Sequence, residues 1–132
     1  MSKAEQIARL RKATGLGWLE ARLYFAGRSA ELCSRIVEAK ERQGSETLHD
    51  PIEEDPDYRQ RISDAKAKAE QVYRDYNAKR NAEYTRRGLH HMVSESRRGS
   101  CHFIWRETKR MLVEEGITWY SPAEMNPGYK FD

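Results

Sequence analysis

The sequence contains few of the residues that mark a secreted, membrane-spanning or sheet-rich protein. Only two of its 132 residues are cysteines, Cys33 and Cys101, and they lie far apart. Such a pair is no disulfide framework, which favours a reducing compartment, the cytoplasm. The longest apolar runs, such as the LYFA of residues 23–26, are far too short to span a bilayer. The N-terminal segment also lacks the apolar core of a signal peptide. We therefore expect a cytoplasmic protein without a membrane partner.

Proline and glycine are also scarce, with four and eight residues, whereas charged residues make up 34% of the chain. This balance is typical of solvent-exposed helices and disfavours a β-sandwich or barrel. The net charge of +3 hides a division along the chain. Residues 1–43 carry nine bases and five acids, residues 44–57 six acids and no base, and residues 58–116 fourteen bases and eight acids. Neither basic segment is charged strongly enough to require a nucleic acid.

Residues 1–43 show the apolar spacing of three short helices. We expect Ser2 and Ser29 to cap the first and third helices and Gly15 to end the first in a left-handed conformation. Helices this short are unstable alone, so they must pack into a bundle. The positions expected to face inward are Ile7 and Leu10, then Trp18, Ala21 and Phe25 flanked by Leu19 and Leu23, then Leu32, Cys33, Ile36 and Val37.

Residues 44–57 have no helical period and are predicted to be an acidic linker. Asp55-Pro56-Asp57 is a helix start signal. From Tyr58 to Tyr76 a heptad-like apolar stripe then predicts a helix that continues to Gly88, with a homodimer through this stripe as one expected assembly. The stripe consists of Tyr58, Ile62, Ala65, Ala69, Val72 and Tyr76.

Residues 58–116 are predicted to form a helical hairpin, because a second amphipathic helix, capped by Ser100, precedes Gly116. Its inward face is expected at Ile104, Thr108, Met111 and Leu112. The tail, residues 117–132, contains a capping box at residues 121–124 that predicts one helical turn. Because the tail is rich in aromatic residues, we expect it to dock on the hairpin. The fold class predicted for the whole chain is all-α.

The first segment carries a short motif around two glycines. Arg11, Thr14, Gly15 and Gly17, followed by Ala21 and a turn at Gly27, resemble the ubiquitin-associated-like three-helix module of bacterial elongation factor Ts. The resemblance covers about a third of the chain and implies a bundle that binds another protein through its first loop. The expected partner-binding residues are Thr14, Gly15, Leu16, Gly17 and Trp18.

The glycine turn has three other interpretations. The motif also resembles the end domain of the ribosomal stalk protein, but the strands that flank it there are absent. A phosphate loop would need a preceding strand and backbone N–H groups that converge at a helix N-terminus. Here a helix is expected before the glycines and no Lys-Ser/Thr pair follows them, so the phosphate interpretation fails. The two glycines could also serve only to let two helices meet at a sharp angle, which is compatible with partner binding.

Three kinds of chemistry are conceivable further along the chain. His90, His91, Cys101 and His102 are zinc-ligand types, but adjacent ligands diverge on a helix and their spacing fits no recognised site. These residues are therefore weak metal candidates, and we expect no metal, no cofactor and no enzyme. A basic cluster with rings between its members suggests nucleic-acid binding instead. The cluster consists of Lys79, Arg80, Arg86, Arg87, Arg97 and Arg98.

The leading hypothesis is a non-catalytic protein-interaction module of bacterial or phage type, with a protein partner that the sequence does not identify. The alternative is a nucleic-acid-binding accessory protein that uses the basic cluster.

Overall fold

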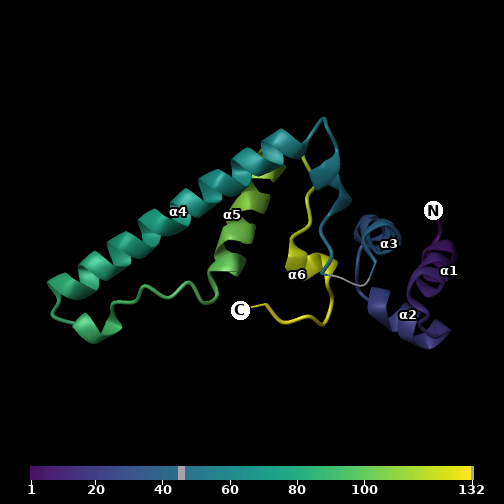
Figure 1. Cartoon of the computed structure of the whole chain (residues 1–132), viewed down its shortest axis with the longest axis horizontal. Coiled ribbons are helices and arrows are strands. Elements are labelled where there is room, and N and C mark those ends of the chain that lie inside the picture. The colour runs from purple at the N-terminus through teal and green to yellow at the C-terminus, as the bar shows by residue number, and fades with distance from the viewer. Residues whose placement is uncertain (45–46, 132) are drawn as a thin grey trace. The chain divides into compact units, whose positions relative to one another are not determined.

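The computed structural model describes residues 1–44 and 47–131, and it confirms the all-α class: no strand occurs in this part of the chain. Figure 1 labels the helices, and two short 3-10 helices accompany them. The elements are α1 (Lys3–Thr14), α2 (Trp18–Phe25), α3 (Ala30–Gln43), η1 (Pro51–Glu54), α4 (Arg59–Arg86), η2 (His90–Met92), α5 (Ser100–Glu114) and α6 (Pro122–Met125). The chain divides into two compact units. Unit 1 comprises residues 1–58 and 119–130, and unit 2 comprises residues 59–118 with residue 131.

The helix boundaries of unit 1 follow the capping residues of the sequence. The Ser2 hydroxyl accepts a hydrogen bond from the backbone N–H of Glu5, and the Ser29 hydroxyl accepts one from Leu32, each at 3.1 Å. Gly15 has the left-handed φ of 78° that ends α1. Each cap satisfies backbone groups that a helix end leaves without a partner.

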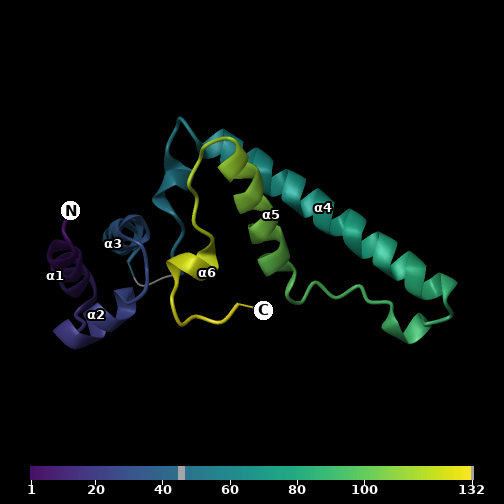
Figure 2. The ribbon, with the colours of Figure 1, turned by 180° about the vertical axis from the view of Figure 1, so that it is seen from behind.

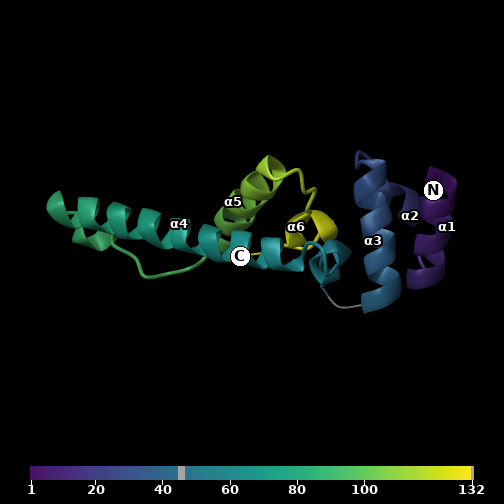
Figure 3. The same cartoon turned by 90° about the horizontal axis from the view of Figure 1, so that it is seen from above.

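The core of unit 1 is built mainly from α1, α2 and α3, which Figure 3 shows gathered together. Of the second helix, only Ala21 and Phe25 are buried, whereas Trp18, predicted to share their stripe, is exposed. Leu48, Tyr120 and Met125 complete the core from outside the three helices. The remaining core residues are Ile7, Leu10, Leu32, Cys33, Ile36, Val37 and Ala39.

The acidic segment and most of the tail belong to unit 1, which differs from the predicted linker and from a tail that docks on the hairpin. Leu48 is fully buried, and its backbone exchanges two hydrogen bonds with the Asn126 side chain, at 2.7 and 2.9 Å. The indole N–H of Trp119, which is also buried, donates to Glu53 at 3.0 Å. These partners lie about seventy residues apart along the chain, so no local pattern could reveal them. The capping box that starts α6 is present as predicted.

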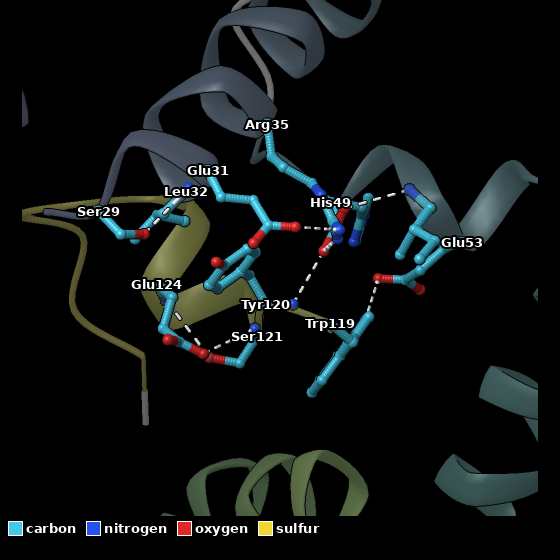
Figure 4. Close-up of polar contacts among 12 residues, drawn as sticks. Ser29, Glu31, Leu32, Arg35, His49, Glu53, Trp119, Tyr120, Ser121 and Glu124 are labelled. Atoms are coloured by element: carbon cyan, nitrogen blue, oxygen red, sulfur yellow. Dashed lines mark hydrogen bonds and ion pairs between the residues drawn. The ribbon is translucent and has the colours of Figure 1, made fainter. Parts of the chain in front are cut away.

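A buried carboxylate, that of Asp50, joins three separated segments of unit 1. Figure 4 labels two of its partners, Arg35 and Tyr120. Its Oδ2 accepts hydrogen bonds from Nη1 of Arg35 at 2.7 Å and from the backbone N–H of Tyr120 at 2.8 Å. Its Oδ1 accepts a third from the N–H of Ile52 at 3.1 Å. The Arg35 guanidinium also lies over the Tyr120 ring, 5.3 Å from the centroid, and pairs with Glu31 at 3.0 Å.

The three donors offset the cost of burying Asp50. Burial raises the pKa of the Asp50 carboxyl, while the N–H groups of Tyr120 and Ile52 and the charge of Arg35 act in the opposite direction. A buried ion pair contributes little net stability compared with an apolar pair, but removing one partner leaves an expensive uncompensated charge. The arrangement therefore penalises any structure in which α3, η1 and the tail are apart.

Unit 2 is an antiparallel hairpin of α4 and α5, visible from both sides in Figures 1 and 2. The predicted stripe is confirmed at Ile62, Ala65 and Ala69, which are buried, but it continues to Tyr73 rather than to Val72 and Tyr76. Tyr73 meets the Phe103 ring edge-on, with centroids 5.5 Å apart. On α5 the fully buried positions are Thr108 and Leu112, both on the predicted face.

The two ends of α5 differ in detail from the prediction. Ser100 is the first residue of α5 rather than its cap, and Gly99, with a φ of 77°, occupies the cap position without a side-chain hydrogen bond. Two parts of the predicted tail belong to the hairpin unit. Ile117 is buried and its N–H donates to the Leu112 carbonyl at 2.9 Å. Phe131 meets the Trp105 ring edge-on, and its carbonyl lies 2.9 Å from Nε2 of His102.

Replacing Arg35 with Met should lower the free energy of unfolding by about 3 kcal/mol at neutral pH, because Asp50 would stay buried without its counter-charge. The pKa of folded Asp50 is raised, and losing Arg35 raises it further, so the loss should shrink as the pH falls through this pKa and the carboxyl is neutralised. Urea unfolding at about pH 7 and pH 4.5 measures both effects.

The matched control is Arg42→Met on the same helix. Arg42 forms an exposed i,i+4 pair with Glu38, so its loss should cost less than about 1 kcal/mol. Equal losses for the two variants, unchanged by pH, would contradict the role assigned to Asp50.

Candidate protein-binding surface and the predicted sites

The glycine turn between α1 and α2 is held by its own hydrogen bonds. The Thr14 hydroxyl donates to the Leu10 carbonyl at 2.6 Å and accepts from the N–H of Leu16 at 3.3 Å. The Gly15 N–H donates to the Arg11 carbonyl at 2.7 Å. Two N–H groups that a phosphate loop would present to a ligand are therefore used inside the turn.

The two glycines of the turn have different roles. Gly15 needs the left-handed φ that an L side chain adopts only at a cost. Gly17 caps α2 with a φ of −67°, and a Cβ there would lie 3.7 Å from Glu20 Oε1, an ordinary contact. Only Gly15 is thus required by the backbone, which supports the interpretation of the turn as helix-joining geometry.

The turn leads directly into an exposed apolar surface on α2. Trp18 keeps 51% of its surface exposed, Leu19 61% and Leu23 62%. Leu19 and Leu23 are one helical turn apart, and Arg22 lies over the Trp18 ring at 5.3 Å from its centroid, so the four side chains form two adjacent rows. We call Trp18, Leu19, Arg22 and Leu23 the α2 surface.

The α2 surface includes one predicted partner-binding residue, Trp18, and adds three that the sequence analysis did not assign. Of the other predicted residues, Leu16 is partly buried against the core, and Thr14 and Gly15 form the turn. Leu19 and Leu23 had been expected to flank a buried stripe. The length of the helix could have identified Leu19 and Leu23 as exposed. A helix of eight residues buries only one narrow face, here Ala21 and Phe25, and leaves its other apolar residues in solvent.

The predicted basic cluster divides into paired and unpaired cations. Arg86 and Arg87 share Glu83, whose pKa is lowered first by the hydrogen bond from Arg86. Arg97 pairs with Glu70 and lies 5.6 Å from the Tyr73 ring centroid. The cluster residues without an ion pair among the described residues are Lys79, Arg80 and Arg98.

The weak metal candidates are not brought together as a site. In the described part of the chain, no group of three or more His, Cys, Asp or Glu side chains is placed to hold a metal ion. His90 and His91 are exposed in η2, while His102 belongs to α5, where it meets the Trp105 ring edge-on at 5.6 Å. Cys33, the cysteine that is not among the metal candidates, is buried, and this burial raises the pKa of its thiol. Cys33 therefore suits packing better than nucleophilic chemistry.

The stripe expected to mediate a homodimer is largely covered within one chain. Ile62, Ala65 and Ala69 are buried in unit 2, whereas Val72 and Tyr76 remain 38% and 49% exposed. Tyr76 stacks on Phe103 with centroids 5.4 Å apart. Of the stripe residues, Val72 and Tyr76 are those that a second copy could most readily reach.

No protein-family model, curated protein or solved structure matches this chain. Within residues 1–44 and 47–131, no helix combines the length and the apolar character needed to cross a membrane.

The same substitution at the two glycines should have different consequences. Gly15→Ser should lower the free energy of unfolding by about 1–2 kcal/mol, the cost of a left-handed L residue. Gly17→Ser should be neutral or slightly stabilising, because Ser is a preferred N-cap. Chemical denaturation followed by circular dichroism measures both, and an equal loss at the two positions would contradict the assignment.

Proposed function

We propose that this chain is a non-catalytic protein-interaction module that binds its partner through the α2 surface. The observation that carries the proposal is the exposure of three large apolar side chains, Trp18, Leu19 and Leu23, on one short helix. Single exposed apolar residues are common, but contiguous ones mark interaction surfaces.

The composition of the α2 surface supports this proposal. Trp and Arg are enriched among the residues that contribute most binding energy in protein interfaces, and Arg22 lies against Trp18. The surface stands on a helix whose opposite face, Ala21 and Phe25, is fully buried, so the binding residues would be presented on a rigid base. The resemblance to the ubiquitin-associated-like module, which implies binding through the first loop, points to the same part of the chain.

The partner would be another protein or a second copy of this chain. Self-association would also draw on Val72 and Tyr76, the exposed part of the predicted stripe. Light scattering at micromolar concentration separates the two possibilities, since a monomer under these conditions excludes self-association.

A photoreactive amino acid at position 19 should crosslink to the partner in the source cell, while the same group at position 12, an exposed site on α1, should not. With the captured partner purified, Trp18→Ala should raise the dissociation constant about 30-fold, which is the effect of losing a central interface residue. Lys12→Ala serves as the control and should leave it unchanged. Retention of full affinity by both Trp18→Ala and Leu19→Asp would contradict the proposal.

A second candidate function is nucleic-acid binding, favoured by the absence of ion pairs at Lys79, Arg80 and Arg98 among the described residues. Cations that are not neutralised within the protein are the ones that can replace counterions on a phosphate backbone. Arg86, Arg87 and Arg97, which have carboxylate partners, would contribute less.

If these three cations hold a single strand, raising the salt concentration from 50 to 200 mM should weaken binding by about 20-fold, because each contact contributes a slope of about −0.7. Lys79→Gln should make the slope of log K against log salt concentration shallower by about 0.7, the share of one contact. Fluorescence anisotropy with a labelled oligonucleotide measures this. Binding that is absent, or independent of salt, would contradict this second candidate.

A further inference from the structure

A pocket of about 370 Å³ lies where the segment 93–99 returns to the start of α5. Its volume is within the range of small-molecule sites. Side chains of α4, of the returning segment and of α5 line it together, and all of them belong to unit 2.

The returning segment is fastened to α4 by one side chain. The Asn81 amide donates to the Ser94 carbonyl at 2.9 Å and accepts from the Ser94 N–H at 3.3 Å. Two hydrogen bonds from one amide fix both the position and the direction of the chain at Ser94. The pocket wall formed by residues 94–99 is therefore held in place by α4.

The charge lining the pocket has one sign. Arg80 and Arg98 contribute guanidinium groups, and none of the described residues that line the pocket is an acid. Arg80 donates from Nη2 to Asn77 and lies 5.6 Å from the Tyr76 ring centroid, but its Nε is buried without a hydrogen-bond acceptor. Among the described residues, this is the buried side-chain polar atom that lacks a partner. Leaving a buried charged donor without an acceptor is costly, so the protein does not fully satisfy the Arg80 guanidinium.

Hydroxyl groups add further donors. The Ser94 hydroxyl accepts from the N–H of Ser96 at 3.0 Å, and the Ser96 hydroxyl accepts from the N–H of Arg98 at 3.2 Å. Each hydroxyl oxygen thus accepts from a backbone N–H with one lone pair, and its own hydrogen can be donated to another acceptor. Ser100 also lines the pocket, at the end of α5 that has no side-chain cap.

Three rings, those of Tyr73, Tyr76 and Phe103, line the pocket. Tyr76 stacks on Phe103 and carries Arg80 over its ring, while Arg106 lies over Phe103 at 5.4 Å from its centroid. These contacts engage the rings of Tyr76 and Phe103 within the protein, while Tyr76 stays 49% exposed. The recognising groups are therefore cations and hydroxyl donors, which select an anion with several acceptor oxygens.

We propose that this pocket binds a phosphate group, with Arg80 and Arg98 as its cations and the hydroxyls of Ser94, Ser96 and Ser100 as neutral donors. The phosphate is carried either by a small phosphorylated molecule or by a nucleic-acid strand. The proposal is independent of the α2 surface, and it differs from the second candidate function because it assigns one pocket rather than a spread of cations.

The test is a titration of the full chain with inorganic phosphate, followed by NMR of the backbone amides. We expect saturable shifts at Ser94, Ser96 and Ser100. Arg98→Gln and Arg80→Gln should weaken phosphate binding at least fivefold. Arg86→Gln, which removes a nearby cation that is paired with Glu83, should leave it unchanged. Circular dichroism of each variant verifies that the hairpin is folded, and Ser96→Ala gives a milder change that retains both cations.

A second titration uses adenosine monophosphate and a single-stranded oligonucleotide. Competition of both ligands with phosphate for the same amides supports the site, and the tighter ligand identifies the source of the phosphate. Absence of saturable shifts at millimolar phosphate would overturn the proposal, as would equal losses in Arg86→Gln and Arg98→Gln. Oligonucleotide binding that persists in such a case would leave the second candidate function standing without this pocket.

Discussion

The carboxylate of Asp50 determines which segments of unit 1 must be together. It is almost fully buried and accepts hydrogen bonds from α3, from η1 and from the residue that follows Trp119. A buried negative charge is tolerated only while its donors are in place, so the cost of separating them falls on the whole unit. Apolar burial supplies the driving force for packing, but it is not directional. The donors around Asp50 specify which of several apolar arrangements is adopted.

The α2 surface does not belong to the contacts around Asp50, and its apolar side chains are mostly exposed. Ala21 and Phe25 fasten α2 to the core, and Gly15 sets the angle at which it departs from α1. Trp18, Leu19 and Leu23 each remain more than half exposed. A protein of modest core size gains stability from covering such residues, so their exposure on a well-fixed helix is an argument for recognition. The phosphate pocket of unit 2 is formed by different chemistry, cations and hydroxyls, on a different element.

Local features of the structure could be predicted from the sequence, and long-range ones could not. Ser2, Gly15 and Ser29 were correctly identified as helix ends because caps act within four residues. The α4 stripe was correct near its start and then failed, since a straight helix of period 3.6 drifts away from a heptad pattern and reaches Tyr73 instead of Val72. The partners of Asp50 and Trp119 were missed because no periodicity links residues that far apart. Arg80 and Arg98 were recognised as basic, but which cations lack a carboxylate depends on the folded arrangement.

Unit 1 is discontinuous in sequence, since residues 59–118 are inserted between its two parts. During synthesis, the first fifty-eight residues leave the ribosome long before Tyr120 and Asn126 exist. For that interval Asp50 lacks one of its three donors, and the backbone of Leu48 lacks the amide that closes over it. The three-helix bundle therefore stays without these contacts until the segment that follows the α4–α5 hairpin has been made. The packing of unit 1 is therefore completed only after residues 120–126 have been synthesised.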